Sequence, residues 1–149
     1  MTDDKKEYTI IIRDAAVEDA PSVAELLGDL GYPATIELVQ EKIRKLGQRK
    51  HDRILVAEKS GIVVGVLSLH IMPLLHHKGN LCRISAFIVS SEYRRQYIGQ
   101  RLLEMAEVYA KANKCFRIEI TSNEKRIDAH TFYTACGYAE RSKRFCKDI

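Results

Sequence analysis

The chain has 149 residues, of which 46% are hydrophobic and 30% are charged. This size and composition are typical of one soluble globular domain, and no apolar run has the length of a membrane span or a signal-peptide core. The net charge of +4 suits an anionic small molecule as well as nucleic acid. We expect one cytoplasmic domain over residues 1–149, with a flexible N-terminus over residues 1–7.

The first half of the chain predicts strands and helices in alternation. Three consecutive isoleucines indicate a strand buried on both faces. Apolar residues at helical spacing, with Pro21 at a start and Gly31 at a stop, indicate two helices. The predicted elements are a strand over residues 8–13, a helix from about 18 to 30, a helix over 36–46, and two strands over 53–58 and 62–70 joined by a hairpin.

The second half predicts a strand, a helix and a further strand before a short final helix. Gly137 stands where a left-handed helix cap favours glycine. The predicted elements are a loop over residues 72–80, a strand over 81–89, a helix from about 99 to 112, a strand over 116–121, a polar turn over 122–126, a helix over 127–136, and closing strands at 138 and 144–147. This order implies an α/β (mixed α+β) fold with a mostly antiparallel twisted sheet of about seven strands and helices on both faces.

A basic, glycine-bearing turn joins the strand that ends at Val89 to the helix after it. Its sequence is Arg94-Arg95-Gln96-Tyr97-Ile98-Gly99. A helix N-terminus presents free N–H groups and partial positive charge, and both suit a pyrophosphate. The sequence therefore predicts an anion site at this turn.

The turn, the element order and the tail from Phe132 to Tyr138 together resemble the GCN5-related N-acetyltransferase (GNAT) family. Arg94 and Gly99 match the phosphate turn of that family, whereas Tyr97 stands where its first glycine is usual. A narrower resemblance, carried by residues 69–77, 121–133 and 144–147, is to aminoalkylphosphonate N-acetyltransferases. The resemblance implies acetyl-CoA as cosubstrate and direct transfer of its acetyl group to the primary amine of a small molecule, for example an aminoalkylphosphonate or another anionic amine.

The resemblance also implies which residues hold acetyl-CoA. In the family, the strand before the turn bulges away from its neighbour and binds pantetheine through its backbone. Because Tyr97 is poorly suited to positive φ, we expect its side chain to point outward. The implied cofactor-binding residues are Phe87, Ile88, Val89, Arg94, Arg95, Gln96, Tyr97, Ile98, Gly99, Gln100, Arg126 and Tyr133.

Acetyl transfer needs a neutral amine and a proton for the leaving thiolate. Tyr133 matches the family tyrosine near the cofactor sulfur, which makes it the predicted general acid. Many relatives carry a glutamate where this chain has Arg83 and Ala86, so the usual base is missing. Glu119 is the candidate base, and deprotonation through ordered water is the alternative.

The acceptor side is assigned to polar residues near the predicted centre. The candidates for substrate binding are His76, His77, Arg83 and His130, and Arg126 is a further candidate for an anionic group. His70, His76, His77 and His130 are the alternative ligands for a divalent metal, since metal dependence occurs among the phosphonate enzymes. Their spacing is not a known ligand motif, so a metal is not the expected cofactor and acetyl-CoA is.

Two other interpretations stay open. A protein, peptide or aminoglycoside-type N-acetyltransferase would share the fold, but the predicted loop over residues 72–80 is placed to cover the pocket. A CoA-binding or DNA-associated regulator without catalysis is supported only by the basic residues between 42 and 53, so nucleic acid is not the expected partner. A homodimer is a family-level expectation. The four cysteines are scattered and are expected to be reduced, without an acyl-enzyme role.

Overall fold

A computed structural model describes residues 9–121 and 127–149 of the chain. The predicted polar turn over 122–126, which includes Arg126, and the N-terminus over 1–7 lie outside the described residues. The elements in chain order are β1 (Ile10–Asp14), η1 (Val17–Asp19), α1 (Ala20–Leu30), α2 (Ile36–Gly47), β2 (Asp52–Lys59), β3 (Ile62–Leu74), β4 (His77–Val89), η2 (Ser91–Tyr93), α3 (Ile98–Ala112), β5 (Cys115–Ile120) and α4 (Ile127–Ala135).

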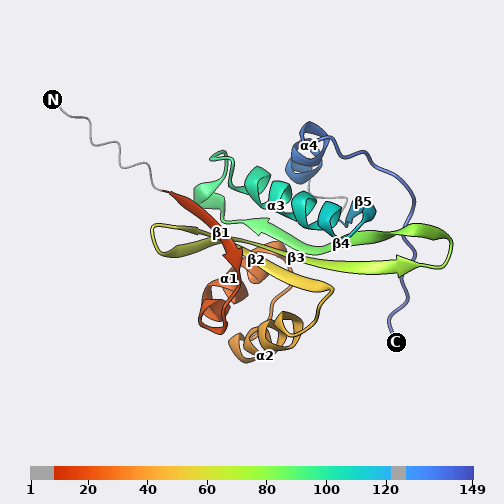
Figure 1. The fold of residues 1–149 in the computed structure, drawn as a ribbon. Helices are drawn as coiled ribbons and strands as arrows, with labels where there is room; N and C mark the ends of the chain where they lie inside the picture. The colour runs from red at the N-terminus through yellow and green to blue at the C-terminus, as the bar shows by residue number, and fades with distance from the viewer. Residues whose placement is uncertain (1–8, 122–126) are drawn as a thin grey trace.

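The described strands form one mixed sheet in the order β1-β2-β3-β4-β5 (Figure 1). The first four strands are antiparallel neighbours, and β5 pairs with β4 in parallel. Helix α3 makes the crossover that a parallel pair requires. The predicted mixed, mostly antiparallel sheet is confirmed. The expectation of a fully buried first strand is wrong, because β1 is an edge strand and Ile11 is 48% exposed.

The described sheet has five strands, not seven. The predicted closing strands at residues 138 and 144–147 are not formed; Phe145, for instance, is 91% exposed. The backbone at Tyr138 instead closes α4, because its N–H donates to the Tyr133 carbonyl at 3.0 Å. Gly137 has φ +90°, so its predicted role as a left-handed cap is confirmed.

The predicted loop over residues 72–80 is also wrong, because β3 and β4 run on as a long hairpin. Pro73 pairs with Asn80 beside a register shift, a position at which a strand tolerates proline. The hairpin extends the sheet at the end opposite the turn after β4 (Figure 1). It therefore does not form the predicted pocket cover.

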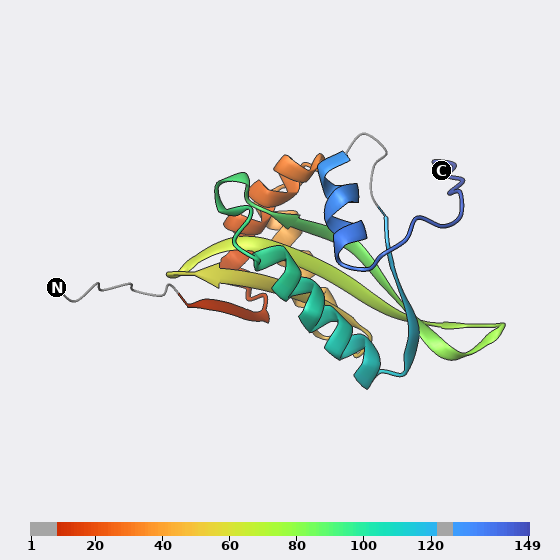
Figure 2. The ribbon, with the colours of Figure 1, turned by 90° about the horizontal axis from the view of Figure 1, so that it is seen from above.

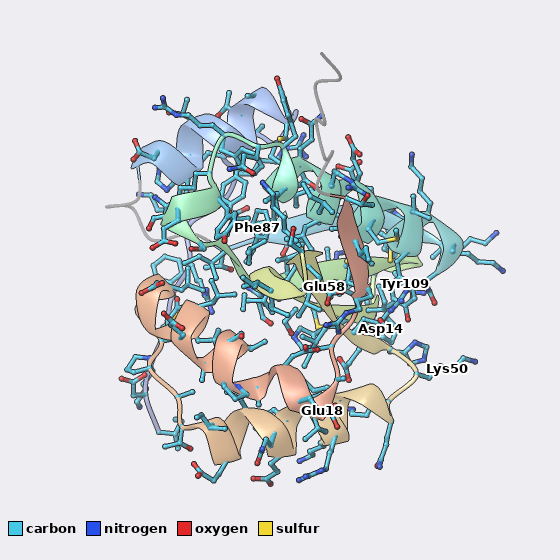
Figure 3. All side chains as sticks on the ribbon, turned by 90° about the vertical axis from the view of Figure 1, so that its left-hand side faces the viewer. Asp14, Glu18, Lys50, Glu58, Phe87 and Tyr109 are labelled. Atoms are coloured by element: carbon cyan, nitrogen blue, oxygen red, sulfur yellow. The ribbon has the colours of Figure 1, made fainter. Side chains whose placement is uncertain are left out.

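Helices cover both faces of the sheet, as predicted. The side of α1 and α2 buries an apolar cluster that includes Val23, Ile43 and Ile88, and the side of α3 and α4 buries a larger one around Leu67 and Leu102. Figure 3 shows Phe87 between the sheet and the α3/α4 layer, and Glu18 on the side of α1. The two faces of β4 therefore contact different apolar clusters.

We expect Asp19→Asn to destabilise the protein at neutral pH by about 1–3 kcal/mol, the usual effect of losing a charged hydrogen bond. Asp19 accepts two hydrogen bonds from Arg13, at 2.7 and 2.9 Å, and a third from the Ala16 N–H at 2.7 Å. The Arg13 guanidinium holds the pKa of Asp19 below its usual range, with burial opposing and the Ala16 N–H assisting.

The sign of this pKa shift fixes the pH dependence. A carboxyl group with a lowered folded-state pKa stabilises the protein above its unfolded-state pKa, and this contribution is lost as the pH falls through the folded-state value. Urea unfolding at pH 7 and pH 3 should therefore show a smaller acid effect in Asp19→Asn than in the wild type. Asp14→Asn is the control, because Asp14 pairs with Arg53 on the surface and is 65% exposed. Equal acid effects in all three proteins would contradict the assignment.

Candidate functional site

The opening between β4 and β5 is the centre of the candidate site. β4 pairs with β5 from Asn80 to Ile84, whose partner is Ile120. β4 then continues to Val89, where its ladder with β3 still runs. Within the described residues, β4 thus has an open edge from Ser85 onward, and Figure 2 shows β5 turning away from it.

A β-bulge marks the start of the open edge. Ser68 of β3 pairs with Ala86, whereas the next residue, Leu69, pairs with Ile84, so Ser85 is the extra residue on β4. A bulge bends its strand and increases the local twist. This bend is the physical reason why β4 leaves β5 here.

The open edge carries backbone groups directed away from β3. The Ser90 N–H donates to the Val64 carbonyl at 2.8 Å, so these residues are a hydrogen-bonded pair of the antiparallel ladder. Hydrogen-bonded pairs alternate along such a ladder. By this alternation Ile88 directs its N–H and C=O groups toward β3, whereas Phe87 and Val89 direct theirs to the open side. An extended ligand could pair with those two residues.

The turn after β4 brings the N-terminus of α3 to the end of this edge. Arg95 and Tyr97 have positive φ of 64° and 62°, and Tyr97 caps α3 without a side-chain hydrogen bond. The first helical hydrogen bond runs from the Arg101 N–H to the Tyr97 carbonyl at 3.0 Å. The N–H groups of residues 98–100 precede it and, with the helix dipole, suit an anion.

Side chains hold the turn in place. Lys59, at the end of β2, donates a hydrogen bond to the amide oxygen of Gln96 and lies 5.6 Å from the centroid of the Tyr93 ring. Arg94 and Arg95 are exposed on the turn. The Gln96 side chain therefore ties the turn to the β2–β3 hairpin, while the two arginines add positive charge beside the helix N-terminus.

We expect Tyr97→Gly to raise the free energy of unfolding by up to about 1 kcal/mol, because a non-glycine residue is strained at positive φ. The Tyr97 side chain is 76% exposed, which confirms the predicted outward orientation and means that little packing is lost. Urea unfolding measures the change. Tyr97→Ala removes the ring but keeps the strain, so the glycine variant should be the more stable of the two; the reverse order would contradict the argument.

Aromatic side chains pack beside the open edge on the α3/α4 face. The ring of Tyr133 lies 6.1 Å from that of Phe87 and 5.7 Å from that of Phe132, centroid to centroid. A Cβ atom on Gly99 would come within 3.2 Å of the Phe132 ring, so glycine lets α4 pack closely on the start of α3. The predicted general acid, Tyr133, thus lies next to the open edge and is partly buried.

A second tyrosine in this cluster has an engaged hydroxyl. Tyr138 donates to Glu107 Oε1 at 3.2 Å. Burial, together with the charge of Glu107, raises the pKa of Tyr138 far above its usual range. Because such a phenol is a weak proton donor, Tyr138 is a poor candidate for the general acid.

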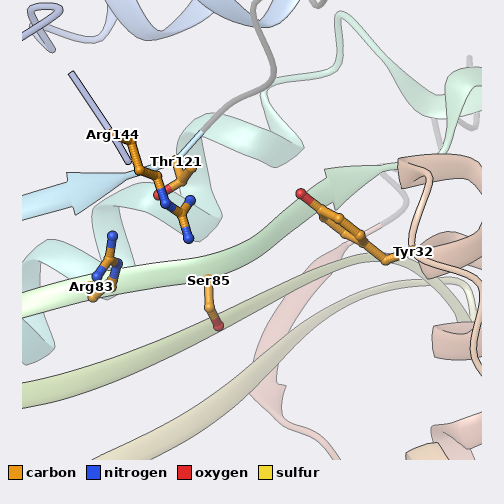
Figure 4. A pocket seen from close by; sticks show the side chains of 5 residues that line it. All are labelled: Tyr32, Arg83, Ser85, Thr121 and Arg144. Atoms are coloured by element: carbon orange, nitrogen blue, oxygen red, sulfur yellow. The ribbon is translucent and has the colours of Figure 1, made fainter. Parts of the chain in front are cut away.

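A polar pocket of about 340 Å³ lies on the other face of the sheet, where β4 and β5 part (Figure 4). Arg83 and Ser85 reach it from β4, and Thr121 follows the end of β5. Tyr32, from the connection between α1 and α2, and Arg144, from the C-terminal segment, complete the lining. The pocket thus combines two guanidinium groups with three hydroxyl groups, a lining that favours a small anionic ligand.

Glu119, the predicted base, lies on this same face of the sheet. It is the register partner of Arg83, and its neighbours Ile118 and Ile120 pack into the core on the opposite face. Its Oε1 is 4.0 Å from Arg117 Nη1, and its side chain is 44% exposed. Glu119 is close to the pocket residues but does not line the pocket.

The predicted histidines do not gather at the pocket. His76 and His77 lie at the tip of the β3–β4 hairpin, where His77 stacks on Phe116 with 3.6 Å between ring centroids. His77 lies six positions before Arg83 on the same strand, which corresponds to about 20 Å. His130 lies on α4, three residues before Tyr133. We therefore leave His76 and His77 out of the site.

Sequence reasoning assigned no role to Tyr32, Ser85, Thr121 or Arg144. A signal was present, because Ser68 and His70 on β3, like Arg83 and Ser85 on β4, interrupt otherwise apolar strands with polar residues at alternate positions. Alternation of that kind indicates one polar face of a sheet.

The described cysteines show no activated thiol at the site. Burial raises the pKa of Cys82 to about 12, and burial also raises the pKa of Cys115 and Cys136. All four cysteines are free of disulfides. Over residues 9–121 and 127–149, no three histidine, cysteine or acidic side chains are grouped as metal ligands would be. In the same residues, no helix is long and apolar enough to cross a membrane.

Comparison with known proteins shows the family of this chain. The profile of the Acetyltransferase (GNAT) family matches residues 20–138. The chain is 35% identical, over 143 residues, to an aminoalkylphosphonate N-acetyltransferase of Salmonella typhimurium, and the match covers 93% of this chain and 90% of that protein.

Solved structures share the fold at low sequence identity. A glucosamine-6-phosphate N-acetyltransferase from Arabidopsis thaliana has a TM-score of 0.80 at 22% identity, with 95% of this chain and 100% of that chain covered. An aminoglycoside N-acetyltransferase in complex with CoA has a TM-score of 0.85 at 11% identity, with 97% of both chains covered.

Proposed function

The chain belongs to the acetyltransferase (GNAT) family, and we propose that its acceptor is a small primary amine that also carries a phosphonate or another anionic group. As a member of this family it is an N-acetyltransferase, and the family uses acetyl-CoA. The finer assignment of the acceptor depends on the pocket between β4 and β5.

The two arginines of the pocket are the observation that carries the acceptor proposal. Arg83 and Arg144 come from distant parts of the chain and line one small pocket. A guanidinium presents a planar pair of donors that matches the oxygens of a phosphonate or phosphate. The pocket lies where the thioester of a cosubstrate bound between β4 and β5 would be. Its position and its positive charge therefore suit an acceptor that is anionic at one end.

Acetyl-CoA fits the other half of the site. Its pyrophosphate oxygens would accept hydrogen bonds from the N–H groups at the start of α3, with Arg94 and Arg95 nearby. Its pantetheine would extend along the open edge of β4 and pair with the backbone of Phe87 and Val89. The acetyl thioester would then lie near Ser85, between the aromatic cluster on one face and the polar pocket on the other.

Direct attack is the mechanism that this arrangement supports. The amine nitrogen forms a bond to the thioester carbon, and backbone N–H groups on the open edge can stabilise the oxyanion. As the carbon–sulfur bond breaks, the phenol of Tyr133 gives its proton to the CoA thiolate, and the proton that the nitrogen loses on becoming an amide restores the phenol through solvent. No acyl-enzyme is needed, consistent with the raised pKa of the thiols of Cys82 and Cys136.

An acceptor panel tests the proposal. CoA release from acetyl-CoA is measured with 2-aminoethylphosphonate, with uncharged amines of similar length, and with a diamine. We expect the highest kcat/KM for the phosphonate. Arg83→Gln and Arg144→Gln should each lower that value by about 10- to 100-fold, the equivalent of one lost charged hydrogen bond, and should leave the uncharged amines nearly unaffected.

Arg117→Gln is the matched control, because it removes the same charge from β5 without a place in the pocket lining. Wild-type preference for an uncharged or cationic amine would contradict the proposal, as would an equal loss for all amines in Arg83→Gln. Absence of CoA release with any amine would favour the non-catalytic interpretation instead, and activity only with peptides or aminoglycosides would favour the corresponding enzyme classes.

A further inference from the structure

Three side chains on adjacent strands form a hydrogen-bonded chain that ends in the pocket. Asp52 begins β2, His70 lies on β3, and Ser85 is the bulged residue of β4. Asp52 Oδ1 is 2.6 Å from His70 Nδ1, and His70 Nε2 is 2.7 Å from Ser85 Oγ. Asp52 and His70 are also register partners, so the sheet itself sets their separation.

The chemistry of the groups gives the chain a direction. A carboxylate only accepts hydrogen bonds, so the Nδ1 atom of His70 carries the proton that Asp52 accepts. The Nε2 atom of a neutral imidazole then accepts from the Ser85 hydroxyl. Asp52 is 8% exposed, and its second oxygen accepts from Arg49 Nε at 2.9 Å. Both carboxylate oxygens are therefore engaged, and the imidazole is fixed in orientation.

The position of the chain points to proton transfer. Only its Ser85 end lines the pocket, and Ser85 is the first residue beyond the last β4–β5 pair. In other enzymes a carboxylate, an imidazole and a hydroxyl in this order let the imidazole accept the proton of the hydroxyl. A hydroxyl oxygen also has lone pairs, so Ser85 can accept a proton from a group in the pocket while it gives its own to His70. In addition, strand β4 carries Arg83 and Ala86 and has no carboxylate that could act as a base.

We propose that Ser85 and His70 withdraw the proton of the acceptor's ammonium group, an inference that rests on the acetyl transfer proposed above. The ammonium N–H bond breaks and its proton goes to Ser85 Oγ, while the hydroxyl proton of Ser85 goes to His70 Nε2. Asp52 stabilises the imidazolium that results. The nitrogen lone pair is then free to attack the thioester, and the imidazolium later releases its proton to water.

Charged groups on the neighbouring elements affect the imidazolium form of His70. Arg83, the register partner of His70 on β4, opposes an imidazolium, and a bound phosphonate would offset its charge. Asp52 favours the imidazolium, and Arg49 lies beyond Asp52. Glu119 on β5 lies across from Arg83, and Arg144 reaches the pocket from the C-terminal segment. The pH dependence should therefore change when the phosphonate acceptor is replaced by an uncharged amine.

The pH profile of kcat/KM tests the inference, measured with the best acceptor of the panel. His70→Gln keeps hydrogen-bonding groups but cannot accept a proton. We expect it to lower kcat/KM at pH 7 by about 10²- to 10⁴-fold, the usual contribution of a general base. The acidic limb of the wild-type profile should disappear, and the deficit should shrink at high pH, where the acceptor is already a free amine. Ser85→Ala should also lower kcat/KM.

Ser68→Ala is the matched control for Ser85→Ala, because Ser68 lies on the same strand as His70 and pairs with Ala86 next to the bulge. Thermal unfolding of each variant separates misfolding from lost chemistry. If His70→Gln keeps the acidic limb of the kcat/KM profile, the inference is overturned. Loss of that limb in Glu119→Gln alone also overturns it. The wild-type rate with the acceptor panel tests the acetyl transfer, whereas the ratio of variant to wild type tests the proton path.

A measurement without substrate keeps the inference testable by itself. Long-range ¹⁵N–¹H spectra of the imidazole rings report which nitrogen carries the proton. We expect His70 to be protonated on Nδ1 when neutral, and its Nε2 resonance to change in Ser85→Ala. Protonation on Nε2, or an unchanged spectrum in Ser85→Ala, overturns the inference.

Discussion

Tyr133→Phe is expected to lower kcat by about 10²-fold or more, the lower end of what a positioned general acid contributes. The phenol lies beside the open edge of β4, with its ring 6.1 Å from that of Phe87, and the thioester is proposed to lie along that edge. Loss of the hydroxyl removes the proposed proton donor for the thiolate and leaves the ring packing in place. The KM for acetyl-CoA should change little, and the high-pH limb of the kcat profile should be lost. Steady-state kinetics across pH measures both.

Tyr138→Phe is the control for this variant. Tyr138 belongs to the same aromatic cluster, with its ring 6.3 Å from that of Tyr133, and its hydroxyl donates to Glu107. Its removal should affect stability more than turnover. If Tyr133→Phe keeps both the wild-type kcat and the high-pH limb, the assignment of the acid is wrong, and solvent must protonate the thiolate.

Local signals at helix ends and turns explain which features the sequence predicts well. Pro21, Gly31 and Gly137 mark helix ends, and each does so in the structure. The basic turn after Val89 is likewise recognisable, because its function depends on neighbouring residues. These signals act over a few residues, so a single sequence carries them in full.

Pairing between distant residues explains what was missed. Pro73 and Gly79 indicate a loop when viewed locally, yet the β3–β4 ladder continues past both. Nothing near Tyr138 shows that its backbone will close α4 instead of joining a strand. In each case the result depends on which distant groups meet the backbone.

Register shifts explain why the proton path was hidden in the sequence. Lys59 pairs with Ile62, and without a slip the same hairpin would pair Asp52 with Leu69. The irregularity after Ala57 shifts the partner of Asp52 to His70. A one-residue change moves a side chain to the other face of a strand. The bulge at Ser85 similarly has no local signature.

Leu102→Ala is expected to reduce the free energy of unfolding by about 2–5 kcal/mol, the usual cost of a cavity left by a fully buried leucine. Leu102 is 0% exposed and packs α3 against the sheet. Its Cδ1 would lie 3.1 Å from a Cβ atom on Gly65, the register partner of Val89 at the open edge. Glycine there lets α3, and with it the proposed pyrophosphate site, lie close to β4.

A double-mutant cycle tests this contact. Gly65→Ala alone should destabilise by about 1 kcal/mol, because Leu102 must shift. In the background of Leu102→Ala the added methyl group has room and partly fills the cavity, so the double variant should be more stable than the sum of the single effects by about 0.5–3 kcal/mol.

Leu103→Ala is the control, because Leu103 is 2% exposed on the same helix but is not a close neighbour of Gly65, and its effect should be additive. Urea unfolding gives the four free energies of each cycle, and a looser α3 should also weaken acetyl-CoA binding in Leu102→Ala. Additivity in both cycles would show that Leu102 does not determine the need for glycine at this position.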